Sequence, residues 1–214
     1  MDLKDKKINF LGDSITQGSG TSSLDKRFTD LIAKDYGAVC RNYGISGTRI
    51  ARQQNGSDPN DYCARFSAMD DDADYVVVFG GTNDFGHGDA PIGSFNDRTV
   101  DTFCGAVHTL FSGLIEKYPF SKIAILTPLH RCNEDNPKGD GNKPYNVGVL
   151  KDYVDIIRKT AEYYSLPVLD LYACSGLQPK IPVIKETYMP DGLHPNDAGY
   201  RILADKIAKF LISL

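Results

Sequence analysis

Short apolar runs rich in β-branched residues alternate along the chain with longer segments in which apolar residues recur every three or four positions. The first pattern predicts buried strands, and the second predicts helices with one apolar face. Five runs fit strands: 8–11, 38–42, 75–79, 122–126 and 167–171. Five segments fit helices: 24–36, 61–69, 98–118, 150–164 and 200–211. This alternation is typical of βαβ units, so we expect an α/β protein whose parallel sheet is covered on both faces.

Three long polar connections, at 80–97, 130–144 and 173–190, follow expected strands. In an open parallel sheet, ligands bind outside the carboxyl ends of the strands. These connections and the turn at 12–19 should therefore crowd one edge of the sheet. Because 214 residues with five strands suit one core and no linker or repeat interrupts them, we expect a single domain spanning 1–214.

Composition narrows the range of partners. The net charge is −4 and no block of Lys or Arg is present, which argues against nucleic acid and favours a small molecule. The apolar runs are too short to cross a bilayer, so we expect no membrane insertion. The charged opening residues lack the succession of a secretory signal, which predicts a cytoplasmic protein unless an export signal has been trimmed. A homo-oligomer is compatible with this composition.

Two short motifs near opposite ends of the chain supply the groups of a serine esterase. Gly-Asp-Ser-Ile-Thr follows the first expected strand and contains Ser14, while Asp-Gly-Leu-His-Pro contains Asp191 and His194. A serine hydroxyl needs a base to remove its proton, and the base needs a partner that fixes its tautomer. Either motif alone has an ordinary structural interpretation, a capped turn or a helix entrance, so the pair is a hypothesis that needs context.

Two further motifs provide that context. Gly-Gly-Thr-Asn-Asp follows the strand at 75–79 and offers the Asn83 carboxamide as a donor to a developing oxyanion. Asn-Tyr-Gly-Ile-Ser-Gly follows the second strand, and Gly44 has no side chain to keep a substrate carbonyl from its N–H. Each motif would also serve as an ordinary turn.

In this order and at these strand ends, the four motifs resemble the four sequence blocks of the SGNH hydrolases, also called GDSL-type esterases. The resemblance implies a three-layer α/β/α sandwich with a five-stranded parallel sheet, similar to flavodoxin. It also implies Ser14 as nucleophile, His194 as base and Asp191 as the acid that orients it. Ser14 N–H, Gly44 N–H and Asn83 would form the oxyanion hole, and the family chemistry requires neither a metal nor another cofactor.

Other residues are weaker candidates for supporting the site or lining a substrate pocket. They are Asp13, Asp84, His87, Arg131 and Tyr188. Arg131 suits a carboxylate or sugar hydroxyls, but solvation at the surface explains it as well. His87 is equally a solvated loop histidine. No spacing of His, Cys and carboxylates indicates a zinc site.

The substrate is predicted less directly. Polar residues in the long loops favour a small acyl group, first of all acetyl, on a polar carrier such as a sugar. An apolar stretch from Ile181 to Met189 is also compatible with lysophospholipase or thioesterase activity, so these alternatives stay open. The same stretch also suits a dimer interface. A flavodoxin-like protein is the alternative of another class, with a phosphate or flavin bound by the hydroxyl-rich turn that contains Ser14, Thr16, Ser19, Thr21 and Ser22.

Overall fold

Five parallel strands form one sheet in the order β2-β1-β3-β4-β5, as the computed structural model of the chain shows for residues 2–55, 60–144 and 147–214. The strands are β1 (Lys7–Gly12), β2 (Val39–Gly44), β3 (Tyr75–Phe79), β4 (Lys122–Leu126) and β5 (Val168–Leu169). All four strand pairs are parallel. The expected α/β fold with a five-stranded parallel sheet is confirmed, and the strand order is the one found in flavodoxin.

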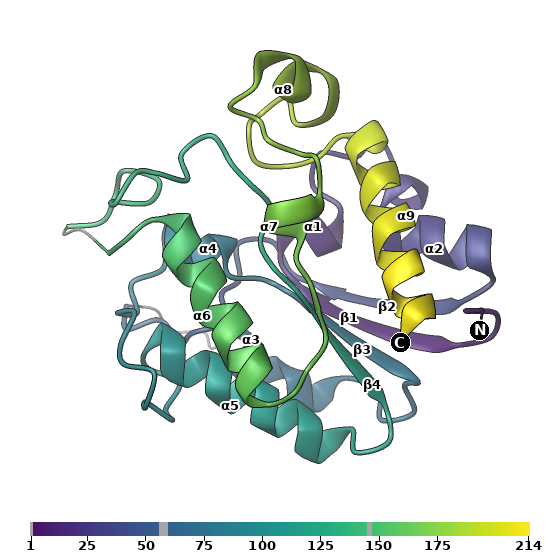
Figure 1. Cartoon of the computed structure of the whole chain (residues 1–214), viewed down its shortest axis with the longest axis horizontal. Coiled ribbons are helices and arrows are strands. Elements are labelled where there is room, and N and C mark those ends of the chain that lie inside the picture. The colour runs from purple at the N-terminus through teal and green to yellow at the C-terminus, as the bar shows by residue number, and fades with distance from the viewer. Residues whose placement is uncertain (1, 56–59, 145–146) are drawn as a thin grey trace.

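Helices cover both faces of the sheet, which makes three layers (Figure 1). One face carries α2 (Phe28–Tyr36) and α9 (Asp197–Ser213), which pack on each other. The other carries α3 (Tyr62–Arg65), α5 (Phe103–Lys117) and α6 (Leu150–Tyr163). Alternate residues of the sheet feed the two cores: Val76 and Val78 point to the α5 side, whereas Val77 and Phe79 point to the α9 side.

Several expected elements begin or end elsewhere in the structure. The segment 24–36 divides into a 3₁₀ turn, Leu24–Lys26, followed by α2, and 61–69 divides into α3 and the 3₁₀ turn Phe66–Ala68. The helix expected from residue 98 begins at Phe103, because the Thr102 hydroxyl caps it by accepting from Gly105 N. The final strand, β5, keeps only two of its five expected residues.

Short helices occupy the connections at the carboxyl ends of the strands. They are α1 (Ser14–Gln17) after β1, α4 (Thr82–Gly86) after β3, α7 (Leu171–Cys174) after β5 and α8 (Pro182–Tyr188) before α9. In Figure 1, α8 stands apart from the three layers, above α9. Within the described residues, no helix has the length and apolar character needed to cross a membrane.

Candidate active site

Ser14 is the first residue of α1, immediately after β1. Asp13 precedes it as the N-cap, and its side chain accepts a hydrogen bond from Ile15 N at 3.0 Å. The turn from strand to helix is tight at Gly12, where a Cβ would lie 1.9 Å from the Thr16 hydroxyl oxygen. The sequence Gly-Asp-Ser therefore holds the Ser14 hydroxyl at the carboxyl end of the sheet.

The structure joins Ser14, His194 and Asp191 in one chain of hydrogen bonds. Ser14 Oγ lies 2.9 Å from His194 Nε2, and His194 Nδ1 lies 2.7 Å from Asp191 Oδ2. The other carboxylate oxygen of Asp191 accepts from Leu193 N at 2.8 Å and from His194 N at 2.7 Å. Both Asp191 oxygens are therefore occupied by donors, which fixes the carboxylate relative to the ring.

Three hydrogen bonds hold the Asp191–His194 turn and the residues just after it against neighbouring loops. Gly192, with φ of +79°, lets the turn close, and its carbonyl accepts from Cys132 N at 2.9 Å. Asp197, at the start of α9, accepts from the backbone N–H and the hydroxyl of Ser22, at 2.8 and 2.6 Å. The loop that follows α1 is thereby tied to the segment that follows His194.

Two carboxyl groups that interact with the His194 imidazole, Asp191 and Asp13, have pKa values shifted in opposite directions. Burial opposes ionisation of Asp191, but hydrogen bonds from His194 and Leu193 outweigh it and lower the pKa of Asp191. Asp13 is buried, and this burial raises its pKa to about 6 against the opposing effects of Ile15 N and nearby His194. Asp191 is therefore ionised beside the ring well below neutral pH, whereas Asp13 becomes ionised only as pH rises past about 6.

Asn83 lies in the first turn of α4, at the end of the neighbouring strand β3. Its side chain is 4% exposed, and Nδ2 donates one hydrogen bond to Thr48 O at 3.0 Å. A carboxamide nitrogen carries two hydrogens, so one remains for a substrate oxygen. Asp84, next in sequence, fixes the same helix because its two oxygens accept from Ile50 N and Ala51 N, each at 2.9 Å.

Gly44 does not fit its expected role as an oxyanion donor. Its N–H already donates to Asn42 Oδ1 at 2.9 Å, and a Cβ on Gly44 would lie 2.3 Å from Gln17 N. Gly44 is thus required by close packing of β2 against α1. Three residues later, Gly47 has φ of +75° and open space around its Cα, and its N–H has no acceptor in the part of the chain that the structure describes.

The remaining candidates have different surroundings. Arg131 is 5% exposed, pairs with Asp140 and lies over the Phe85 ring, so it is neither solvated nor open to a substrate. Tyr188 is half-buried and packs against the core on the α9 side. His87 is exposed, and its Nε2 lies 3.3 Å from Gly47 O.

Two side chains that support the site carried no signal in the sequence. Arg65 donates to Gly12 O at 2.6 Å, to Tyr43 O at 2.5 Å and to the Thr48 hydroxyl at 3.0 Å, and so joins the ends of β1 and β2 to the following loop. Tyr200 donates to Ile15 O at 2.7 Å and holds α1 against α9. These contacts span up to 185 residues of sequence, so local patterns do not predict them.

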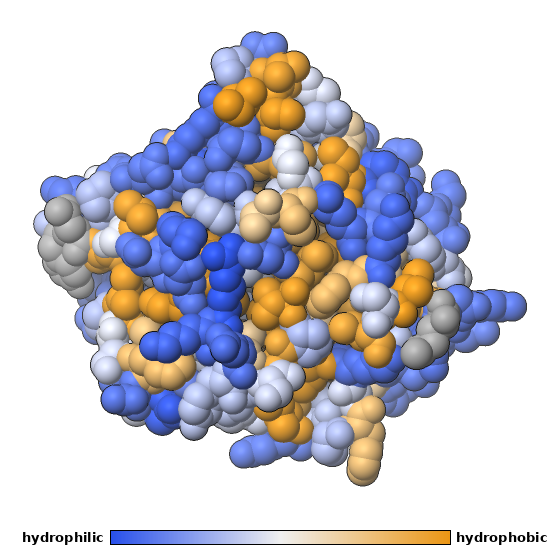
Figure 2. Space-filling view, in the orientation of Figure 1, coloured by the Kyte–Doolittle hydropathy of each residue, from blue (hydrophilic) through white to orange (hydrophobic). Residues whose placement is uncertain are grey.

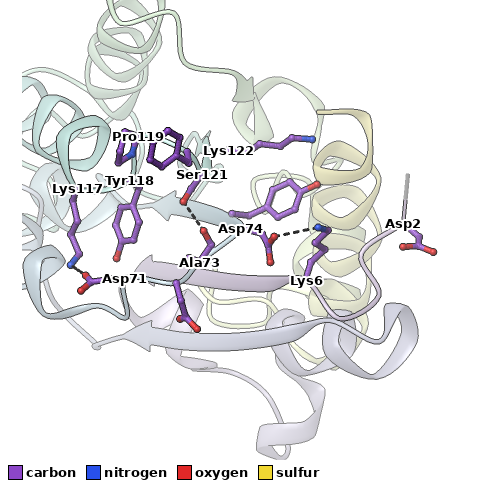
Figure 3. Close-up of a pocket in the computed structure, with 13 residues that line it drawn as sticks. Asp2, Lys6, Asp71, Ala73, Asp74, Lys117, Tyr118, Pro119, Ser121 and Lys122 are labelled. Carbon is purple, nitrogen blue, oxygen red and sulfur yellow. Dashed lines mark hydrogen bonds and ion pairs between the residues drawn. The ribbon is translucent and has the colours of Figure 1, made fainter.

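The opposite edge of the sheet contains a different kind of depression. A hollow of about 670 Å³ lies at the amino ends of β1, β3 and β4 (Figure 3). Two of its lysines face carboxylates: Lys6 pairs with Asp74, and Lys117 pairs with Asp71. None of the four sequence motifs contributes to this lining. Among the described residues, no cluster of three or more His, Cys, Asp or Glu side chains could bind a metal ion.

Comparison with known proteins places this geometry in a family. The model of the GDSL-like lipase/acylhydrolase family matches residues 10–202. The chain belongs to this family. GDSL-type members are serine carboxylic ester hydrolases, and the four motifs and the flavodoxin-like sheet agree with that membership.

Individual relatives cover almost the whole length of this GDSL-type chain. A GDSL lipase of Mycobacterium tuberculosis is 26% identical over 225 residues, which cover 99% of this chain and 84% of that protein. A solved structure from Lactobacillus plantarum is 32% identical with a TM-score of 0.85, over 99% of this chain and 98% of that one. The lipase/acylhydrolase of Enterococcus faecalis, at 22% identity and a TM-score of 0.69 over 97% and 96% of the two chains, shares the fold.

Proposed function

We propose that this protein hydrolyses esters through an acyl-enzyme formed on Ser14. The observation that carries the proposal is the hydrogen-bonded chain from Ser14 Oγ through His194 to Asp191, at 2.9 and 2.7 Å. His194 Nε2 takes the hydroxyl proton as Ser14 Oγ bonds to the ester carbonyl carbon, and Asp191 stabilises the resulting imidazolium. His194 then gives the proton to the departing alkoxide, which leaves as the alcohol.

The second half of the reaction uses the same imidazole. A water molecule gives a proton to His194 Nε2 as its oxygen attacks the acyl carbon, and the proton returns to Ser14 Oγ when the acid departs. The negative oxygen of both tetrahedral intermediates would be held by Ser14 N–H, the free amide hydrogen of Asn83 and a glycine N–H. Gly47 replaces Gly44 in this proposal, because the Gly44 N–H is engaged with Asn42.

The substrate that we propose is a small acyl ester, first of all acetyl, of a polar carrier such as a carbohydrate. Exposed polar side chains of the loop after β4, those of Asn133, Asp135 and Lys138, support a polar carrier. A two-domain esterase active on acetylated mannans is similar in fold, at 21% identity and a TM-score of 0.62, over 99% of this chain and 50% of that one.

A long-chain acyl or lysolipid substrate is the second candidate, and α8 is the feature that favours it. Apolar side chains are exposed at the top of the view in Figure 2, where α8 lies. Ile181 is 51% exposed and Val183 is 62% exposed, whereas Met189 is buried. The same pair would suit a contact with a second copy of the chain.

The flavodoxin-like alternative has less support. Its phosphate cradle needs free hydroxyls after β1, but Ser14 Oγ is engaged with His194, Thr21 Oγ1 donates to Gly18 O and Ser22 Oγ donates to Asp197. Hydroxyls engaged in this way are poor candidates for binding a phosphate.

The test is a panel of esters with one variant as the blank. Wild-type protein should cleave 4-nitrophenyl acetate and O-acetylated sugars, and should cleave octanoyl esters and lysolipids more slowly. Ser14→Ala should remove all of these activities. If the octanoyl ester or the lysolipid is the better substrate, the second candidate is correct. If Ser14→Ala retains wild-type activity, the acyl-enzyme mechanism is wrong.

A further inference from the structure

A separate hollow of about 260 Å³ adjoins the oxyanion side of the candidate active site. Three segments converge on it, and its polar lining is Gln54, Asn55, His87, Asp89, Asn142 and Lys143. His87 directly follows α4, one helical turn after Asn83, which is about 6 Å along the helix axis. The His87 ring also lies 3.3 Å from the carbonyl of Gly47. A molecule in this hollow would therefore lie beside the ester carbonyl.

The wall of the hollow is rich in groups that bind hydroxyls. The side chains of Gln54, Asn55 and Asn142 make no hydrogen bond within the described residues, although all three residues are exposed at the rim. An amide side chain can both donate to and accept from a hydroxyl. The Asp89 carboxylate is held in place beside Gln54 and Asn55, because its oxygens accept from Gln54 N at 2.8 Å and Asn55 N at 2.7 Å.

Lys143 adds an ammonium group to this lining. It is 7% exposed, and within the described part of the chain it donates one hydrogen bond, to Asp84 O at 2.7 Å. Burial lowers the pKa of Lys143 to about 8, although the carboxylates of Asp84, Asp140 and Asp89 act in the opposite direction. An ammonium group has three hydrogens, so donors remain for a ligand.

The charges around the hollow favour a neutral ligand. Asp89 and Lys143 line the hollow, the carboxylates of Asp84 and Asp140 also act on Lys143, and Asp140 is paired with Arg131. An anionic carrier would gain attraction from Lys143 but meet repulsion from the carboxylates. A neutral hydroxyl can hydrogen-bond with both kinds of group, because it can donate to a carboxylate and accept from an ammonium or an amide.

The volume of the hollow favours a small ligand. About 260 Å³ is just below the range of about 300–1,000 Å³ that pockets for drug-sized ligands occupy, so the hollow suits a single ring. The remaining lining includes Ala90, Pro144 and Val147, which can pack against the C–H groups of a sugar.

We propose that this hollow is the subsite for the carrier of the ester, and that the carrier is a neutral sugar ring. The proposal rests on the hydrolase function proposed above and identifies where its alcohol portion binds. Gln54, Asn142 and Lys143 hydrogen-bond the hydroxyls of the ring while Ser14 attacks the acyl group that the ring carries.

The test compares substrates with and without the ring. The substrates are mono-O-acetylated methyl glucoside, mannoside and xyloside, the acetylated methyl glucuronoside, which adds a carboxylate, and 4-nitrophenyl acetate, which lacks the ring. For the best of the three neutral sugars, the ratio of its kcat/KM to that of 4-nitrophenyl acetate should fall about tenfold in the double variant Gln54→Ala with Asn142→Ala, because two hydrogen bonds are lost. Both side chains are exposed, so the fold should tolerate their removal.

Asn96→Ala is the matched control. Asn96 is an exposed amide outside the hollow, and its replacement should leave the ratio unchanged. The proposal is overturned by an unchanged ratio in the double variant, by faster cleavage of the glucuronoside, or by a wild-type protein that cleaves 4-nitrophenyl acetate but none of the sugars. A failure of the proposed hydrolase function would give a different result. In that case the wild-type protein would not cleave 4-nitrophenyl acetate, or Ser14→Ala would still cleave it.

Discussion

Replacing Asp191 by Asn should reverse the tautomer of His194 while leaving the shape of the turn unchanged. Asp191 Oδ1 accepts from two backbone N–H groups, of Leu193 and His194, at 2.8 and 2.7 Å. These donors require an oxygen, so the amide introduced by Asp191→Asn must place its oxygen there and its NH₂ group opposite His194 Nδ1. Nδ1 then has to accept, which puts the ring proton on Nε2, the atom that faces Ser14.

A histidine protonated on Nε2 cannot take the Ser14 proton. The expected loss in kcat is about 10⁴-fold, equivalent to about 5.5 kcal/mol of activation free energy, because the reaction must proceed through the minor tautomer. KM should change little, since Asp191 makes no predicted contact with substrate. The assay is steady-state hydrolysis of 4-nitrophenyl acetate, with urea unfolding to establish that the variant folds.

Glu186→Gln supplies a control that removes the same charge from an exposed position on α8. It should keep wild-type kcat. If Asp191→Asn retains more than about a tenth of wild-type kcat, another group orients His194 and the argument from the two backbone donors is wrong.

Three further predictions concern Asn83, Asp13 and Glu134. Asn83→Ala should lower kcat about a hundredfold or more, because one oxyanion donor contributes about 3 kcal/mol; an unchanged kcat for 4-nitrophenyl acetate would exclude it from the oxyanion hole. The pKa of buried Asp13 is raised from 3.8 to about 6, so its ionisation destabilises the fold as pH rises through this window, by up to about 3 kcal/mol. Asp13→Asn should remove this loss, and urea unfolding at pH 4 and pH 7.5 would contradict the prediction if wild type and variant showed the same pH dependence. Burial opposes ionisation of Glu134, but hydrogen bonds led by that from His130 lower its pKa from 4.5 to about 2. Its contribution to stability, up to about 3 kcal/mol, is therefore present above pH 4.5 and lost as pH falls toward 2, and acid unfolding of Glu134→Gln should lack that step.

The strands whose bounds the sequence predicts correctly are those buried on both faces of the sheet. β3 and β4 have the expected bounds because every residue in Tyr75–Phe79, and all but the first in Lys122–Leu126, is buried. The two short helices α1 and α4 were not predicted, because a single turn is too short to show helical periodicity. The helix α8, with seven residues, is about two turns long and lies in a segment for which the sequence predicts a loop.

Within the candidate site, residues that act through their side chains were easier to predict than a residue that acts through its backbone. The spacing of Asp191 and His194 limits how their side chains can meet Ser14, and the structure has that contact. Gly44 and Gly47 occur in one motif, and their residue type does not say which N–H is free. The Asn42 side chain and the backbone of α1 decide that point, and both depend on tertiary packing.

Arg131 illustrates the limit for charged residues. Its charge suggested either solvent or a substrate, but the side chain is buried against Phe85 and paired with Asp140, nine residues away. A buried ion pair of this kind depends on how the loop folds back on α4, which the local sequence does not reveal.

The measurement that tests the central claim most directly is the location of the acyl group during turnover. The protein would be mixed with 4-nitrophenyl acetate, quenched in acid within the first turnover and digested for peptide mass analysis. We predict one acetyl group, on Ser14, in wild-type protein and none on the corresponding peptide of Ser14→Ala. Acetyl found on another residue, or undiminished hydrolysis by Ser14→Ala, would contradict the assignment of Ser14 as the nucleophile.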